Sequence, residues 1–203
     1  MTRVIGVVLA GGLARRMGGG DKGALLLGGE TMLARVIARL APQVESIVLN
    51  ANGDPARFAD YGLPVVADSI AEYPGPLAGV LAGLDHAATV GASHVISAAA
   101  DTPFFPRDLA GRLAEGAVTQ AHPVALAATH EEGRTMRHPT FGLWPVALRE
   151  DLRAALNDGL RKVVLWTDQH GAAQVVFPAG TFFNINTPED LAAAHARLEE
   201  DAT

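Results

Sequence analysis

The sequence predicts a single α/β domain with a mainly parallel central sheet flanked by helices. Short, unbroken apolar runs alternate with longer amphipathic stretches, an order typical of parallel sheets with right-handed helical connections. The 203 residues are enough for one domain with a substantial core and too few for two. Because the sequence contains no repeat, low-complexity tract or interdomain linker, we expect residues 1–203 to form one domain.

The first half of the chain is predicted to hold four strands and two helices. The strands are short apolar runs beside turn residues, as expected of strands buried on both faces: Val4–Leu9, Ser46–Leu49, Leu63–Ala67 and His94–Ala100. Thr31 is a suitable N-cap for a helix that ends at about Leu40. Pro76 is a suitable first residue for a helix that continues through Ala88.

The second half is predicted to hold four helices and three extended segments. The helices are expected from Pro106 to about Glu115 and over Val146–Asn157, Leu160–His170 and Pro188–Glu200. The extended segments are Val124–Ala128, Thr140–Trp144 and Gln174–Phe177. Thr187 is a natural N-cap immediately before Pro188.

Polar or glycine-rich residues follow each of the first four predicted strands. Leu9 precedes a glycine-rich loop, and Asn50, Asp68 and Asp101 come directly after the next three strands. Ligands of open α/β sheets bind beyond the carboxyl ends of the strands. We therefore expect these four strand ends to converge on one cleft.

Composition excludes several classes of function. The formal net charge is −6, and the sequence has no basic stretch large enough for non-specific nucleic-acid binding. Cysteine is absent, which excludes disulfides, thiolate metal sites and cysteine nucleophiles. The opening apolar run has no clear cleavage site, and no apolar run is long enough to span a bilayer. These features favour a cytoplasmic protein that binds neither nucleic acid nor membrane.

The glycine-rich segment Leu9–Lys22 is the strongest candidate for a phosphate-binding loop. Its glycines let backbone N–H groups turn toward a polyphosphate, and Arg15 or Arg16 together with Lys22 would neutralise the charge. A Walker A motif is excluded because Lys22 is followed by Gly23 instead of Ser or Thr. The spacing of Gly18, Gly20 and Gly23 fits a dinucleotide fingerprint by accident, since it lies well after the strand end. The remaining alternative is a flexible surface loop.

Asp101 is the candidate metal ligand. A carboxylate at the mouth of a buried strand, followed by Thr102 and Pro103, suits Mg²⁺, which prefers one or two carboxylates together with phosphate oxygens and water. The alternative is that Asp101 caps the following helix, although Thr102 or Asp108 could also do so. The residues alone do not decide between these two roles.

Three further segments carry weaker signals. The stiff turn around Gly75 and Pro76, with Gly79 one helical turn later, would let the backbone lie against a flat ring, or it packs for stability alone. His138 and Arg161 are cations of the kind most often found solvated at a surface. The Asn residues of the segment Asn184–Asn186 are either ligands or simple turn residues.

Together these segments resemble the bacterial molybdenum cofactor guanylyltransferase family over nearly the whole chain. The matching pieces occur in the family's order: Leu-Ala-Gly-Gly…Arg-Met-Gly-Gly with a later Asp-Lys, Asn-Ala-Asn at 50–52, Tyr-Pro-Gly-Pro-Leu-Ala-Gly at 73–79, Asp-Thr-Pro at 101–103, His-Pro-Thr at 138–140 and Asn-Ile-Asn-Thr-Pro-Glu at 184–189. The sequence departs from the family in an extra glycine at 18–20 and in the cationic run 134–137, which leaves the loop geometry open.

The resemblance implies a Rossmann-like nucleotidyltransferase fold and a set of ligand contacts. It implies GTP contacts by Leu9, Ala10, Gly11, Lys22, Asn50, Asp68, Gly75, Gly79 and Asp101. Asp101 would also bind Mg²⁺, and Arg161, Asn184 and Asn186 would serve the acceptor or the metal. The N-terminal half would thus bind GTP and the C-terminal half molybdopterin.

The implied reaction is transfer of GMP from GTP to the phosphate of molybdopterin, with release of pyrophosphate. Lys22, Asp101 and Arg16 would be the catalytic residues, with Arg15 as an alternative to Arg16. Molybdenum insertion proteins or apo-molybdoenzymes are possible transient partners. The alternatives are a cytidylyltransferase or another nucleotidyltransferase of the same fold, and a non-catalytic GTP-binding adaptor that delivers the cofactor.

Overall fold

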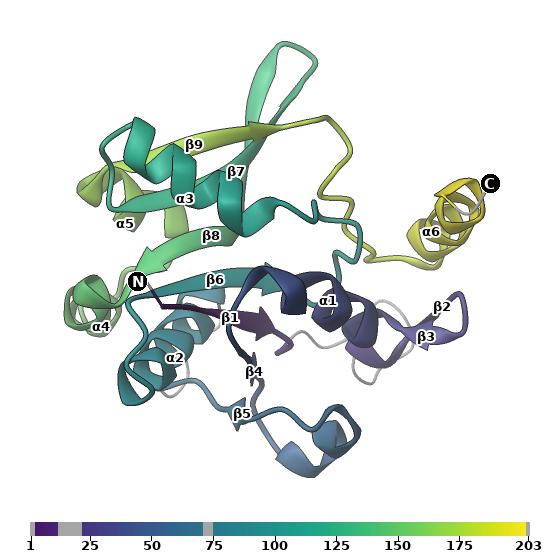
Figure 1. Ribbon diagram of the computed structural model, residues 1–203, viewed down its shortest axis with the longest axis horizontal. Coiled ribbons are helices and arrows are strands. Elements are labelled where there is room, and N and C mark those ends of the chain that lie inside the picture. The colour runs from purple at the N-terminus through teal and green to yellow at the C-terminus, as the bar shows by residue number, and fades with distance from the viewer. Residues whose placement is uncertain (1–2, 12–21, 71–74, 202–203) are drawn as a thin grey trace.

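The computed structural model describes residues 3–11, 22–70 and 75–201, which fold around one seven-stranded sheet (Figure 1). Across the sheet, the strands are β5 (Val65–Val66), β4 (Ile47–Asn50), β1 (Val4–Leu9), β6 (His94–Ala99), β8 (Arg134–Pro145), β7 (Val124–Glu131) and β9 (Ala172–Phe177). All neighbouring pairs are parallel except those of β8, which is antiparallel to both β6 and β7. The predicted mainly parallel sheet is confirmed.

Helices cover both faces of the sheet. The helices are α1 (Met32–Leu40), α2 (Pro76–Thr89), α3 (Leu109–Thr119), α4 (Arg149–Asn157), α5 (Val163–His170) and α6 (Pro188–Asp201). Short 3₁₀ helices span Lys22–Ala24, Ala41–Gln43, Pro55–Tyr61 and Val146–Leu148, and a small hairpin pairs β2 (Leu26–Leu27) with β3 (Glu30–Thr31). One apolar cluster packs α1 and α3 on one face, and a second packs α2, α4 and α5 on the other.

The two predicted N-caps are present in the structure. Thr31 Oγ1 accepts a hydrogen bond from the Ala34 N–H at the start of α1. Before α6, the Asp190 N–H donates to Thr187 Oγ1 while Asp190 Oδ2 accepts from the Thr187 N–H at 2.9 Å. This reciprocal pair satisfies backbone donors that the first helical turn leaves without partners.

Several elements differ from the predicted bounds. α5 begins at Val163 instead of Leu160, and β7 continues to Glu131 instead of ending at Ala128. α3 begins at Leu109 instead of Pro106, because residues 106–108 form a turn in which the Pro106 carbonyl accepts from the Leu109 N–H. β8 is much longer than Thr140–Trp144 and pairs with β7 through the two-residue turn Glu132-Gly133. Both turn residues have positive φ, 49° and 74°, which matches the right-handed twist of a hairpin.

β9 forms one edge of the sheet, and α3 covers the outward backbone groups of this strand. The Gln120 side chain donates from Nε2 to the Gln174 carbonyl and accepts from the Gln174 N–H, each at 3.2 Å. Arg112 Nη2 donates to the Val176 carbonyl at 2.6 Å. Side chains of the neighbouring helix therefore take the place of a further strand along this part of the edge.

Candidate functional site

A cavity of about 370 Å³ lies at the carboxyl edge of the parallel strands, within the size range of small-molecule sites. It is lined by residues from the ends of β1, β4 and β6 and from the segment after β5. Four other segments also contribute: the 3₁₀ helix at Lys22–Ala24, the start of α2, β8 and the segment before α6. The lining residues are Leu9, Ala10, Gly11, Gly23, Asn50, Asn52, Asp68, Gly75, Pro76, Ala99, Ala100, Asp101, Thr140 and Asn184. The structure thus brings the four predicted strand ends together around one space.

Backbone pairing beyond the regular strands holds the floor of the cavity. The Ala10 N–H donates to the Asn50 carbonyl at 2.8 Å, and the Ala100 N–H donates to the Leu9 carbonyl at 3.2 Å. These bonds extend the sheet by one residue on each side of β1. The register of the sheet therefore fixes the positions of the residues at the strand ends.

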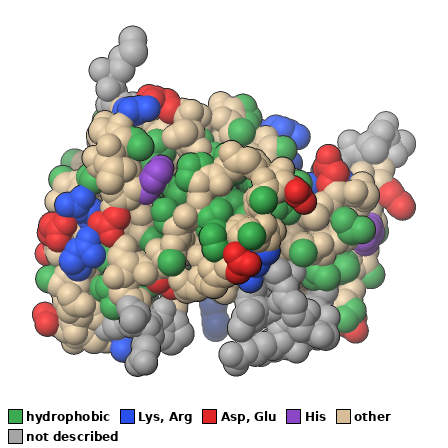
Figure 2. All heavy atoms as spheres, turned by 90° about the horizontal axis from the view of Figure 1, so that it is seen from below, with side chains coloured by type: hydrophobic (Ala, Val, Ile, Leu, Met, Phe, Trp, Pro, Cys, Tyr) green, Lys and Arg blue, Asp and Glu red, His purple; other side chains and the backbone are tan. Residues whose placement is uncertain are grey.

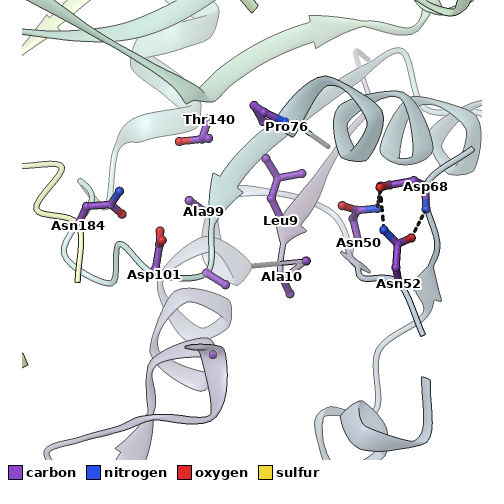
Figure 3. A pocket seen from close by; sticks show the side chains of 14 residues that line it. Leu9, Ala10, Asn50, Asn52, Asp68, Pro76, Ala99, Asp101, Thr140 and Asn184 are labelled. Atoms are coloured by element: carbon purple, nitrogen blue, oxygen red, sulfur yellow. Dashed lines mark hydrogen bonds between the residues drawn. The ribbon is translucent and has the colours of Figure 1, made fainter. Parts of the chain in front are cut away.

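Figure 3 shows the two carboxylates of the cavity at opposite ends, with Leu9 and Ala10 between them. Asp68 lies beside Asn50 and Asn52, while Asp101 lies beside Asn184. The cavity therefore has an amide-rich end at Asp68 and an end at Asp101.

Two asparagines fix the Asp68 carboxylate. Asn50 Nδ2 donates to Asp68 Oδ1 at 2.9 Å, and Asn52 Nδ2 donates to Asp68 Oδ2 at 2.8 Å. The Asn52 amide oxygen also accepts from the Asp68 backbone N–H at 2.9 Å. Each carboxylate oxygen thus accepts one amide hydrogen bond and keeps a further lone pair for a ligand.

Gly79 lies behind Asn50 and, within the described residues, does not line the cavity. A Cβ at this position would lie 2.2 Å from Asn50 Oδ1 and 2.8 Å from Leu9 Cδ2. Asn50 is itself 5% exposed, so it has little room to move. Gly79, which was expected to border the guanosine site, thus leaves space for Asn50, and Asn50 lines the cavity.

The Asp101 end is tied to the segment before α6. The Asp101 carbonyl accepts from the Ile185 N–H at 2.9 Å, and Thr102 Oγ1 donates to Asn184 Oδ1 at 2.6 Å. Thr102 is buried, whereas Asn184 is exposed toward the cavity. Asp101 and Asn184 therefore lie side by side, although they are 83 positions apart in sequence.

The alternative role of Asp101 as a helix cap is wrong. α3 begins at Leu109, and Asp108 occupies the N-cap position without a side-chain capping bond. Asp101 lies far ahead of that helix and faces the cavity (Figure 3). Its carboxylate oxygens, beside the Thr102 hydroxyl, form a donor set of the kind that Mg²⁺ prefers. Within the described ranges, no three His, Asp or Glu side chains cluster as a metal site.

The phosphate-loop prediction is only partly covered by the structure. Arg15 and Arg16 lie outside the described residues, as do Tyr73 and Pro74. The backbone of Lys22 is described in a 3₁₀ helix, and the next residue, Gly23, lines the cavity. The chain therefore leaves the glycine-rich loop at the cavity that Asp101 also faces.

Two predicted acceptor-side residues do not line the cavity in the described part of the chain. Arg161 is exposed between α4 and α5. The backbone N–H of Asn186 donates to Asp190 Oδ2 at 2.9 Å, which places this residue at the start of α6. Asn184 alone of the three is a lining residue.

The cavity is also lined by residues that were not predicted as site residues, among them Gly23, Asn52, Pro76 and Thr140. Asn52 lies two residues beyond Asn50, a repeat of amides that could have indicated a second side chain on the same side. Thr140 follows His138 and Pro139 in β8, but the antiparallel direction of that strand was not visible in the sequence. Its contribution to the cavity depends on that reversal.

His138 is a packed residue and not a solvated cation. Its ring lies 4.5 Å from that of Phe182, and its Nε2 lies 2.9 Å from Oγ1 of the buried Thr129. Burial lowers the pKa of His138, and the neighbouring Glu131 offsets part of this shift. Its position two residues before Thr140 makes it a support for that wall of the cavity.

No helix in the described part of the chain is long and apolar enough to cross a bilayer.

Comparison with known proteins agrees with the motifs. The model of the MobA-like NTP transferase domain matches residues 6–173. A molybdenum cofactor guanylyltransferase of Bradyrhizobium sp. (strain ORS 278) is 56% identical over 95% of this chain and 92% of that protein. One of Nitrobacter hamburgensis is 54% identical, covering 93% of this chain and 91% of its own length.

Solved structures share the fold at low sequence identity. A molybdopterin-guanine dinucleotide biosynthesis protein A from Archaeoglobus fulgidus has a TM-score of 0.76 at 22% identity, covering 97% of this chain and 99% of that one. A 4-diphosphocytidyl-2C-methyl-D-erythritol synthase from Anaerococcus prevotii also has a TM-score of 0.76, at 13% identity, covering 98% and 99%. These two likenesses describe the fold alone, whereas the high-identity relatives confirm the resemblance predicted from the motifs. The chain belongs to the MobA-like NTP transferase family, among the molybdenum cofactor guanylyltransferases.

Proposed function

We propose that this chain transfers GMP from GTP to the phosphate of molybdopterin in the molybdenum cofactor, releasing pyrophosphate. The observation that carries the proposal is the strand-end cavity with one carboxylate at each end, in a chain that belongs to this family. GTP has a polar base at one end and a charged triphosphate at the other. Such a ligand can place its base at one carboxylate and its phosphates, with a bound cation, at the other.

The Asp68 end binds the guanine base in this proposal. Guanine presents two neighbouring donors, N1–H and the N2 amino group, and a carboxylate can accept from both. Asn50 and Asn52 already donate to Asp68, and these two bonds fix the orientation of its carboxylate oxygens. Adenine and cytosine each place a ring acceptor where guanine has N1–H, so a site built around Asp68 rejects them.

The Asp101 end holds the reacting phosphates. Asp101 and phosphate oxygens would bind Mg²⁺, which supplies charge neutralisation at the α-phosphorus. Lys22 and Arg16, with Arg15 as the alternative, stabilise the charge that grows on the pyrophosphate leaving group. Leu9, Ala10 and Gly11 contact the nucleotide through their backbone, and Gly75 borders its base together with Pro76. A general base is unnecessary because the attacking phosphate is already ionised near neutral pH.

The C-terminal half binds the acceptor in this proposal. Asn184 and Thr140 line the cavity from that half, and the attacking phosphate would approach the α-phosphorus from their side. Alignment of two anionic reactants is the main task of such a site, since there is little covalent chemistry for the protein to perform. Arg161 and Asn186 would contact more distant parts of the pterin. A cytoplasmic location and transient contacts with molybdenum insertion proteins or apo-molybdoenzymes belong to the same proposal.

Release of pyrophosphate from GTP, Mg²⁺ and molybdopterin tests the proposed function. We expect release that depends on all three components and that CTP does not support at equal concentration. Equal or faster release with CTP would make the chain a cytidylyltransferase. Tight GTP binding without any pyrophosphate release would favour the non-catalytic adaptor.

A further inference from the structure

A carboxylate on α2, Asp85, joins three parts of the chain that are distant in sequence. Ser69 Oγ donates to Asp85 Oδ2 at 2.5 Å, and Arg153 Nη2 donates to Asp85 Oδ1 at 2.5 Å. Arg149 Nε lies 3.6 Å from the same Oδ1. One oxygen of Asp85 thus accepts a hydrogen bond from the segment after β5, while the other contacts the arginines of α4.

Asp85 is an unusual residue for its helix. α2 is otherwise largely apolar, and most of its side chains are buried against the sheet. The Asp85 side chain is 29% exposed, and a partly buried carboxylate requires partners to offset its lost hydration. Glu150 extends the cluster outward, accepting from both Arg149 and Arg153. Figure 2 views the molecule from below and shows basic and acidic side chains side by side at the left. This is the side on which α4 lies in Figure 1.

The sheet itself holds the neighbourhood of Asp68 only weakly. β5 has two residues and stands at the edge of the sheet, so its pairing with β4 ends at Val66, two residues before Asp68. The hydrogen bonds of Asp68 to Asn50 and Asn52 connect it to the last residue of β4 and to the segment that follows. None of these bonds connects Asp68 directly to α2, although Asn50 itself packs against Gly79 of that helix. Pro76, the first residue of α2, also lines the cavity.

The bond between Ser69 and Asp85 supplies this connection. Asp68 and Gly75 both line the cavity and are the two ends of one chain connection, residues 69–74. Ser69, the first residue of that connection, is hydrogen-bonded to Asp85 of α2, the helix that follows the connection. Ile70 adds an apolar contact with the cluster under α2. The separation between Asp68 and the start of α2 is therefore set from outside the cavity.

We propose that Ser69 and Asp85 are positioning residues that hold Asp68 at the distance from α2 that a guanine base requires. Neither side chain lines the cavity in the described part of the chain, so each acts through Asp68. This inference rests on the proposed function, because it takes Asp68 as the residue that binds the base. It adds that Arg149 and Arg153 of α4, which contact Asp85, support nucleotide binding from outside the cavity.

The test variants are Ser69→Ala and Asp85→Ala. One control is Ser69→Thr, which keeps the hydroxyl at an exposed position. The other is Glu150→Gln, which alters only the outer part of the charged cluster. We expect the KM and calorimetric Kd for GTP to rise about tenfold in the two Ala variants, from loss of one charge-assisted bond. The kcat should change by less than about twofold, since the reacting phosphates lie at the other end. Ser69→Thr and Glu150→Gln should bind GTP as the parent does.

The double variant separates positioning from general destabilisation. If the two residues act through one bond, the double variant should bind GTP no more weakly than Asp85→Ala alone. Wild-type KM and Kd in both Ala variants would overturn the inference, as would equal loss of affinity in Glu150→Gln. Thermal unfolding of each variant shows whether a merely structural change has occurred. If the unmodified protein itself fails to bind GTP, the proposed function fails instead, and that result is visible before any variant is made.

Discussion

The hydroxyl of Thr102 donates a 2.6 Å hydrogen bond to Oδ1 of Asn184, 82 positions later in the chain. Thr102 is 2% exposed, so its hydroxyl has little access to water. Because the amide oxygen of Asn184 is held in this way, its Nδ2 remains to donate to a ligand in the cavity. The bond joins the end of β6 to the segment before α6 at the Asp101 end of the site.

Removal of the Thr102 hydroxyl should lower kcat while reducing the unfolding free energy only slightly. Thr102→Val keeps the shape of the side chain and loses the bond, which costs about 1 kcal/mol of unfolding free energy. We expect kcat to fall about tenfold because Asn184 is no longer oriented toward the phosphates. Thr102→Ser keeps the hydroxyl and should retain most of the activity. Steady-state kinetics of the two folded variants check this, and equal kcat values would contradict it.

Asp68→Asn should weaken guanine recognition. An amide has one acceptor oxygen in place of two, and its NH2 would face one of the guanine donors, so GTP affinity should fall on the order of 100-fold. The preference for GTP over ITP, which lacks the N2 amino group, should shrink in parallel. Competition binding with the two nucleotides measures this preference. Asp60→Asn, an exposed charge on the neighbouring 3₁₀ helix, is the control and should leave both affinities unchanged.

Asp101→Ala should abolish Mg²⁺-dependent transfer in a protein that still folds. The carboxylate is the proposed protein ligand of the ion, and its loss leaves the phosphate charge without an anchored counterion. Magnetic resonance of Mn²⁺ in the presence of GTP gives a readout that does not depend on turnover. Circular dichroism establishes that the variant is folded. Full turnover together with normal Mn²⁺ binding would remove Asp101 from the metal site.

Gly79→Ala should disturb Asn50. The new methyl group would lie 2.2 Å from Asn50 Oδ1, so the buried amide must move. We expect a loss of about 2 kcal/mol in unfolding free energy and a weaker affinity for GTP. Gly111→Ala is the matched control, because nothing lies within 4 Å of its Cβ position in α3. That variant should be about as stable as the parent or up to about 1 kcal/mol more stable, as chemical denaturation will show.

The stability of the protein should decrease in mild acid through His138. Its pKa is lowered in the folded protein, so below the reference value of 6.5 the unfolded chain takes up the proton more readily. The unfolding free energy is therefore unaffected by this group above pH 6.5 and falls as the pH drops toward the folded pKa.

Replacing His138 by Gln should make this decline shallower while keeping a polar partner for Thr129. Some decline should remain, because burial also lowers the pKa of His94. Denaturation series between about pH 5 and 8 measure the slope. An identical slope in the parent and the variant would contradict the assignment.

Strand positions were predictable because they depend on local apolarity. The runs ending at Leu9 and Ala99 are buried on both faces, and such runs stand out in any sequence. The convergence of Asn50, Asp68 and Asp101 then followed from the parallel direction of their strands, without any knowledge of side-chain contacts.

Side-chain partnerships were not predictable from the sequence, because they depend on register and direction. The antiparallel direction of β8 places Thr140 at the cavity, and it originates in the positive φ of Glu132 and Gly133. The turn Glu-Gly is a weaker hairpin signal than Asn-Gly or Asp-Gly. Contacts such as Ser69 with Asp85 or Gly79 with Asn50 require two elements to be packed before they exist.

The covering of β9 by α3 has a consequence for how copies of the protein meet. An open sheet edge invites strand addition by another chain, which leads to aggregates at the concentrations reached during expression. Because Gln120 occupies both the N–H and the carbonyl of Gln174, and Arg112 occupies the carbonyl of Val176, an incoming strand finds these groups already bonded. Side chains in and directly after α3 thus reduce the number of backbone groups on this edge that are open to strand addition.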